Sequence, residues 1–162
     1  MTTKLKLIGA FSSLALLAAC QSSPPPSAAT SGGGTAGSTA GAAVPGSQED
    51  LVAQGIDRVF FDFNKSNIRS DASATLDRQA AFLQQYSQDH VQIAGNTDER
   101  GTEEFNIALG QRRANAARDY LVAKGVAGSR IATISYGKSR PIALGSDEQS
   151  WAQNRNAVTA VQ

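Results

Sequence analysis

Acidic, amide and arginine side chains are concentrated between Gly95 and Leu121. Within this stretch Asp98 supplies a carboxylate, Arg113 a guanidinium, and Asn106 an amide that both donates and accepts hydrogen bonds. Groups of these types can converge on a charged or polar ligand. They can equally be the solvated surface of a loop and of the helix that follows it. Deciding between the two requires the elements that position them.

A helix is predicted over residues 103–123. Thr102 stands at its N-cap position, and two acidic residues stand in its first turn. At about 100° per residue, Asn106 and Arg113 fall near the middle of its apolar arc, whereas Arg112 falls on the polar face. An inward guanidinium needs a carboxylate or a ligand, because burying it unpaired is costly. Asp98 is the nearest candidate in the sequence, so a purely structural Asp98–Arg113 ion pair stays open as an alternative.

The remaining pattern predicts one domain over residues 49–162, in which strands alternate with helices. Ser70 and Asp71 can cap the first helix. The expected fold is an α/β (α+β) sandwich of the order β-α-β-α-β-(short α)-β, with helices packed on one small mixed sheet. The strand order is left open. The predicted strands cover residues 58–63, 91–95, 130–136 and 156–161, and a short helix covers residues 148–153.

The first 19 residues predict a secretory signal, with two lysines, an apolar run over residues 7–17 and small residues before Cys20. That run is shorter than the roughly 20 residues that span a bilayer. The segment Leu17-Ala18-Ala19-Cys20 resembles a bacterial lipobox. The resemblance implies cleavage before Cys20, a diacylglyceryl group on its sulfur and an acyl chain on its new amine. Because Gln21 is not aspartate, analogy with lipoprotein sorting favours the outer membrane.

Residues 21–48 consist almost entirely of Ser, Pro, Gly, Ala and Thr, without charge, which predicts a disordered linker after the lipidated cysteine at residue 20. Such a chain has a reach of roughly 30 Å. Without the signal the chain has 13 basic and 14 acidic residues, a net charge of −1. That balance argues against a nucleic-acid partner, because proteins that bind nucleic acids usually have a basic surface.

The polar stretch resembles the signature of the OmpA-like peptidoglycan-binding domain. The family pattern places Asp, Gly, Asn, Leu and Arg-Ala at fixed intervals, and the resemblance extends from Val59 to Val161. All of these positions are present here, as Asp98, Gly101, Asn106, Leu109, Arg113 and Ala114. The resemblance implies an OmpA-like fold that binds peptidoglycan.

In that family the ligand is the diaminopimelate residue of the peptidoglycan stem peptide. Carried over by motif, Asp98 would bind its ammonium, Arg113 its carboxylate, and Asn106 would bind the ligand or orient Arg113. Such a division suits a zwitterionic ligand, because arginine offers a planar fork to a carboxylate. The further positions that match the family's pocket are Arg100, Phe61, Asp62 and Arg155.

The lipobox, the linker and the segment Ser135-Tyr-Gly-Lys138 are most similar to lipoprotein members of this family. The resemblance to those members implies a lipid-anchored outer-membrane protein, whose domain lies in the periplasm of a Gram-negative bacterium. It would tether that membrane to the wall and act with the Tol proteins, TolB among them, in envelope integrity and cell division. An OmpA-like lipoprotein without Tol partners is the alternative. A motor-type anchor would need a transmembrane helix.

Two positions depart from the pattern of those lipoproteins. Asn96 stands where histidine is usual, and Asn156 stands where the second arginine of an Asn-Arg-Arg segment is expected. The first departure can alter hydrogen bonding beside the pocket or contact with a protein partner. The second weakens the assignment of Arg155 to the site.

An enzyme is the main rival interpretation. Ser135 and Lys138 have the Ser-x-x-Lys spacing of penicillin-binding proteins, but the Lys-Thr-Gly and Ser-Asp-Asn elements are absent from the sequence. Asp98 and Glu99 are adjacent, which rarely suits the opposed carboxylates of a glycosidase. His90 is the single histidine, and the acidic turn lacks calcium-loop spacing. We therefore expect a binding protein without catalytic residues, metal or cofactor.

Overall fold

The computed structural model describes residues 43–162, so the predicted signal, Cys20 and the linker up to residue 42 lie outside it. Four strands form one mixed sheet in the order β1-β4-β2-β3. The strands are β1 (Arg58–Phe60), β2 (Val91–Asn96), β3 (Ile131–Gly137) and β4 (Asn156–Val161). The helices are α1 (Gln48–Ala53), α2 (Ser70–Gln85), α3 (Glu103–Ala123) and α4 (Glu148–Asn154), with a 3₁₀ turn η1 at Gly128–Arg130.

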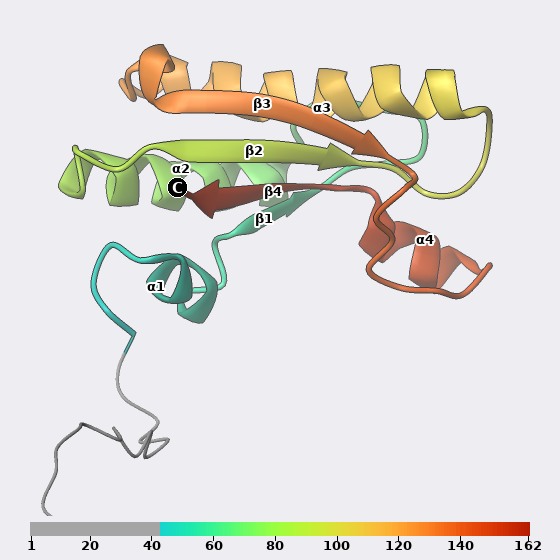
Figure 1. Cartoon of the computed structure of the whole chain (residues 1–162), viewed down its shortest axis with the longest axis horizontal. Coiled ribbons are helices and arrows are strands. Elements are labelled where there is room, and N and C mark those ends of the chain that lie inside the picture. Colours follow the sequence, from blue (N-terminus) through green and yellow to red (C-terminus); the bar gives the residue numbers. More distant parts are fainter. Residues whose placement is uncertain (1–42) are drawn as a thin grey trace, which may run out of the picture. The chain divides into compact units, whose positions relative to one another are not determined.

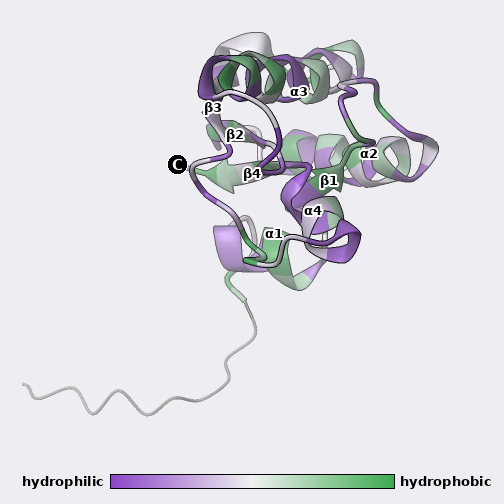
Figure 2. Ribbon diagram, turned by 90° about the vertical axis from the view of Figure 1, so that its right-hand side faces the viewer, coloured by the Kyte–Doolittle hydropathy of each residue, from purple (hydrophilic) through white to green (hydrophobic). Residues whose placement is uncertain are grey.

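The sheet is mixed, as predicted, because β2 and β3 are parallel while β4 runs antiparallel to both β1 and β2. Helix α3 is the crossover between the parallel strands. Figure 2 shows α2 and α3 on the same side of the sheet, with the fourth helix beside the start of β4 in Figure 1. The α+β fold with helices on one small mixed sheet is therefore confirmed.

The core lies between the sheet and the two long helices. Leu76 and Leu83 of α2, Ile93 of β2 and Leu121 of α3 are 0–1% exposed. The side chains recur at the helical and strand spacings that put them on one face. Burial of these apolar side chains fixes how the helices lie on the sheet.

Helix α3 lies unusually close to β2 at a pair of glycines. A methyl group added to Gly95 would fall on the carbonyl of Gly110, and one added to Gly110 would fall on the hydroxyl of Ser135. Glycine is needed here because the two backbones touch. The contact sets the height of α3 above the sheet, and with it the position of the inward polar residues on that helix.

Three local predictions differ from the structure. The strand predicted over residues 58–63 ends at Phe60, because its partner β4 begins opposite it at Asn156. Helix α1 was not predicted, and it begins at Gln48, inside the segment expected to be linker. Ser47 caps it by accepting from the Asp50 backbone, and the Val161 backbone donates to the Gln48 side chain across 2.8 Å. Helix α2 begins after Arg69, without a side-chain cap, so the expected cap at Ser70 is wrong.

A membrane-crossing element was not expected in the folded domain. Among residues 43–162, no helix combines the length and the apolar character that crossing a bilayer requires.

Candidate functional site

Three connecting segments meet at the end of the sheet where β2 ends and β4 begins, on the right in Figure 1. They are the β1–α2 loop, the β2–α3 loop, and the junction between α4 and β4. Helix α3 contributes its first turns from above. The residues predicted from the sequence as a site all lie in or beside this region.

Arg113 is completely buried and binds the backbone of two of these segments. Its Nη1 donates to the Asn96 carbonyl across 2.7 Å, its Nη2 to that of Asp62 across 3.0 Å, and its Nε to that of Lys65 across 2.9 Å. In the described residues no carboxylate oxygen lies within 4.0 Å of it, so the alternative of a structural Asp98–Arg113 ion pair is wrong. Carbonyl oxygens satisfy this guanidinium without neutralising it.

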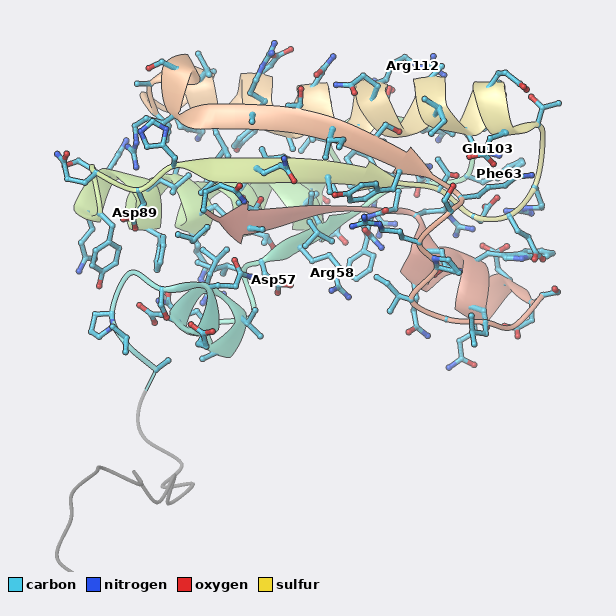
Figure 3. All side chains as sticks on the ribbon, viewed as in Figure 1. Asp57, Arg58, Phe63, Asp89, Glu103 and Arg112 are labelled. Atoms are coloured by element: carbon cyan, nitrogen blue, oxygen red, sulfur yellow. The ribbon has the colours of Figure 1, made fainter. Side chains whose placement is uncertain are left out.

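Burial lowers the pKa of Arg113 to about 10, an effect that the charge of Asp98 partly opposes. The side chain therefore stays a cation at neutral pH. Arg112 is exposed and lies on the outer side of α3, as Figure 3 shows. The helical geometry predicted from the sequence, with Arg113 inward and Arg112 outward, is confirmed.

Asn106 shapes the loop that precedes its helix. It is 1% exposed, and its Nδ2 donates to the carbonyls of Arg100 and Thr102 across 2.9 and 3.0 Å. These bonds close the β2–α3 loop on itself beside Arg113. In this structure Asn106 therefore holds the loop rather than the guanidinium.

Asp98 is 3% exposed and is bound by two other arginines. Arg100 donates from Nη2 to Oδ2 across 2.6 Å and from Nε and its backbone N–H to Oδ1, while Arg155 Nη1 lies 3.4 Å from Oδ2. Burial acts to raise the pKa of Asp98, but the hydrogen bonds and the charge of Arg100, together with the hydrogen bond from Arg155, hold that pKa below its usual value. The carboxylate is ionised at neutral pH.

Arg155 lies in the site despite the departure at the neighbouring residue. It is 6% exposed and donates to the Phe61 carbonyl across 3.2 Å and to Glu148 Oε1 across 2.6 Å. Phe61 and Asp62 contribute their carbonyls. The Asp62 carboxylate instead faces the surface, where it pairs with Lys65 and Arg69.

The sequence did not point to Phe63 and Trp151, which enclose the Arg100 guanidinium from two sides. Its central carbon lies 3.9 Å from the centre of the Phe63 ring and 4.0 Å from that of Trp151. Glu99 Oε1 accepts from the indole N–H across 3.0 Å. Phe63 is labelled at this end of the molecule in Figure 3. Trp151 belongs to α4, and local sequence pattern does not show that α4 folds against the β2–α3 loop.

A small hollow of about 10 Å³ lies between these side chains, which is room for no more than about one water molecule. It is lined by Phe63, Asn64, Thr97, Asp98, Arg100, Phe105, Asn106, Leu109 and Arg113.

The residues of the rival enzymatic interpretation are not assembled. Ser135 Oγ accepts from the Gly137 backbone, while Lys138 Nζ donates to the Gly101 carbonyl across 2.8 Å. A serine nucleophile activated by a lysine would require a hydrogen bond between them. In residues 43–162 no group of three His, Cys, Asp or Glu side chains is placed to hold a metal ion.

The match to the OmpA family covers residues 60–155, which include every side chain described for this site. The chain belongs to the OmpA family. Its curated relatives include peptidoglycan-associated lipoproteins from Mesorhizobium japonicum, 57% identical over 75% of this chain and 73% of the relative, and from Pasteurella multocida, 42% identical over 98% and 97%. Within the OmpA family the chain belongs to the peptidoglycan-associated lipoproteins, which confirms the resemblance found in the sequence.

Two solved structures have a similar fold. The peptidoglycan-associated lipoprotein of Burkholderia pseudomallei is 46% identical, with a TM-score of 0.64 over 65% of this chain and 90% of that structure. The C-terminal domain of Helicobacter pylori MotB, 22% identical with a TM-score of 0.61, shares the fold. Membership of this OmpA-family group agrees with the prediction that the protein is not an enzyme.

Proposed function

We propose that this protein binds peptidoglycan non-covalently through the diaminopimelate of the stem peptide, and so tethers the outer membrane to the cell wall. The names of its relatives and its place in the OmpA family support peptidoglycan binding. The choice of diaminopimelate rests on the match of the sequence to the family motif and on the charges at the site.

The observation that carries the proposal is the state of Arg113. Burying a guanidinium is costly, and this one is held by three carbonyls without a carboxylate within 4.0 Å among the described residues. A ligand carboxylate beside it would supply the missing negative charge. An arginine binds such a carboxylate by donating hydrogen bonds from its remaining N–H groups.

The opposite charge is provided by the Asp98 carboxylate, which lines the same hollow. It is ionised, buried and within reach of a ligand that enters between the loops. The free end of diaminopimelate carries an ammonium and a carboxylate on one carbon. Asp98 would bind the ammonium and Arg113 the carboxylate, so the two side chains together would recognise both charges at that end of the ligand.

The other predicted residues would hold these two in place. Asn106 closes the loop over the hollow, and Arg155 contacts Asp98 while it fixes the Phe61 carbonyl. The Asp62 carbonyl positions Arg113, although the Asp62 carboxylate lies outside the site. These are positioning roles that follow from the contacts.

The lipid anchor and the Tol partners belong to the same proposal. Cys20 would carry the S-diacylglycerol and N-acyl chains, because the lipobox precedes it. Two or more chains hold a protein stably to a membrane. Binding of TolB, and a role in envelope integrity and cell division, would follow from membership of the Tol-associated lipoproteins. An anchor that binds the wall without TolB is the alternative, and a pull-down with purified TolB separates the two.

The decisive experiment is co-sedimentation of the mature, unlipidated chain (Cys20→Ser) with purified sacculi. Diaminopimelate-containing sacculi should retain the protein, and soluble diaminopimelate-containing stem peptide should release it. Sacculi that contain lysine instead lack the second carboxylate and should retain much less. Equal retention on both kinds of wall would show that Arg113 does not read that carboxylate, and no retention on either would sink the proposal.

A further inference from the structure

Arg100 occupies the position where a cation binds best in this site. Its guanidinium lies against Asp98, with Nη2 to Oδ2 at 2.6 Å, and between the rings of Phe63 and Trp151, at 3.9 and 4.0 Å. We call Asp98, Phe63 and Trp151 the cation cage. A carboxylate with two aromatic faces attracts any cation of suitable size, whether it comes from the protein or from a ligand.

The cage has no room for a second cation while Arg100 is inside it. The adjoining hollow has a volume of about 10 Å³, far less than an amino-acid side chain with its own ammonium and carboxylate needs. Asp98 itself is only 3% exposed. A ligand ammonium that approaches this carboxylate must therefore take the place of the Arg100 side chain.

The charges of the site allow that exchange. Three carboxylates, those of Asp98, Glu99 and Glu148, lie around three guanidinium groups, those of Arg100, Arg113 and Arg155. If Arg100 moves toward solvent and a zwitterion enters, the ligand ammonium takes over the pairing with Asp98. The ligand adds one charge of each sign, so the exchange leaves the net charge of the site unchanged apart from the displaced arginine.

Arg100 can leave at little cost to the fold. Its side chain is 32% exposed, in contrast to 8% for that of Arg155 and complete burial for Arg113. Its side-chain hydrogen bonds, ion pairs and ring contacts in the described chain involve the cage and the exposed carboxylate of Glu148, at 4.0 Å. Arg113 and Arg155, by contrast, hold backbone carbonyls of the loops.

We infer that Arg100 is an internal competitor, which fills the cation cage in the free protein and is displaced by the ammonium group of the ligand. The inference rests on the proposed function and adds how the site is regulated. The competitor keeps Asp98 paired and the aromatic rings apart until a ligand arrives. A ligand that brings its own cation restores the close pairing of this buried carboxylate, which Arg155 alone contacts only at 3.4 Å.

The test uses the fluorescence of Trp151, the single tryptophan of the chain, together with calorimetry. The mature unlipidated chain (Cys20→Ser) is titrated with the tripeptide L-Ala-γ-D-Glu-diaminopimelate, in parallel with Arg100→Ala and Arg100→Gln. Arg112→Ala is the matched control, because it removes an exposed arginine from the neighbouring helix. The melting temperature of each variant shows that it is folded.

Without ligand, the Trp151 emission of both Arg100 variants should differ from that of the parent, because the guanidinium no longer stacks on the indole. At saturation the emission of parent and variants should coincide, because the ligand then fills the cage in each. Both Arg100 variants should bind the tripeptide about three- to tenfold more tightly than the parent, and Arg112→Ala should match the parent.

Weaker binding by the Arg100 variants, or a difference in emission that persists at saturation, would overturn the inference and make Arg100 a direct ligand contact. The proposed function would survive that result, because the parent still binds. If neither the parent nor the variants bind the tripeptide, the proposed function fails, and the inference fails with it.

Discussion

Asn96 donates a hydrogen bond from its side-chain amide to the side-chain oxygen of Asn156 across 2.8 Å. These are the two positions at which the sequence departs from the pattern of its lipoprotein relatives. They are distant in sequence but adjacent on β2 and β4, and the bond between them is buried. The two departures therefore form one structural unit, in which one amide pair replaces two groups that the family pattern makes cationic or titratable.

The first prediction concerns that pair. Asn156→Ala and Asn96→Ala should each lower the free energy of unfolding, by about 1–3 kcal/mol, because each leaves a buried amide without its partner. The double variant should lose less than the sum, with a coupling of about 0.5–1.5 kcal/mol. Urea unfolding of the four proteins measures this. Additive losses would mean that the bond contributes nothing of its own.

Arg113 should be needed for both stability and binding. Arg113→Lys keeps the charge but cannot reach three carbonyls, so we expect a loss of about 2–4 kcal/mol in unfolding free energy and at least a tenfold loss of peptidoglycan binding. Arg112→Ala is the control and should change stability by less than about 0.5 kcal/mol. Equal losses of binding from the two variants would contradict the site as described.

The contact between Gly95 and Gly110 gives a prediction at a distance from the charges. Gly110→Ala would force α3 away from the sheet, at a cost of about 1–3 kcal/mol or more, and would move Arg113 with it. Gly128→Ala is a matched control, since an added methyl there meets only ordinary contact with Val122. Thermal unfolding and sacculus binding should both report the difference, and unchanged binding by Gly110→Ala would show that the height of α3 is unimportant.

The pKa of Asp98 gives a prediction about pH. That pKa lies below its usual value, so the folded state binds fewer protons than the unfolded chain as the pH falls. The stability that the carboxylate contributes is therefore complete above about pH 5, begins to fall near pH 4, and is lost as the pH falls further through the folded pKa. The difference in unfolding free energy between the parent and Asp98→Asn should follow this course. A difference that disappears already near pH 6 would contradict it.

The anchor is tested by Cys20→Ser in the full-length chain. Without the sulfur, lipid transfer cannot occur, and the variant should be found unprocessed or soluble in the periplasm. Detergent-phase partition of membrane fractions, followed by immunoblotting, distinguishes the outcomes. If parent and variant enter the outer-membrane fraction equally, the protein is not held there by lipid on Cys20.

Long amphipathic elements were predictable from the sequence. The bounds of α3 match because its caps and apolar spacing are local, and the inward position of Arg113 follows from the same spacing. Helix α1 was missed, because it has six residues and only one of them, Leu51, is buried. Strand order was out of reach, since pairing of β1 and β2 with β4 depends on contacts between distant segments.

The site was predictable in part, for the same reason. The motif placed Asp98, Asn106 and Arg113 in one region, but the helical spacing alone left a direct ion pair between the two charged residues open as an alternative. In the structure Asp98 is bound by Arg100 and Arg155 instead. The positions of Phe63 and Trp151 around Arg100 result from loops that fold together, which helical or strand periodicity does not encode.

The bond between Val161 and Gln48 places the beginning of the described chain at the end of the sheet opposite the site (Figure 1). If the lipid anchor pulls from the amino-terminal side while the wall holds Arg113, tension acts lengthwise along the strands. Because β1 and β4 lie side by side and antiparallel, such a pull loads their hydrogen bonds in shear, all together, instead of opening them one after another. If the protein tethers the membrane to the wall as proposed, the domain is oriented to bear the mechanical load between them. Single-molecule stretching between residue 43 and the β2–α3 loop should give a higher rupture force than stretching across the sheet.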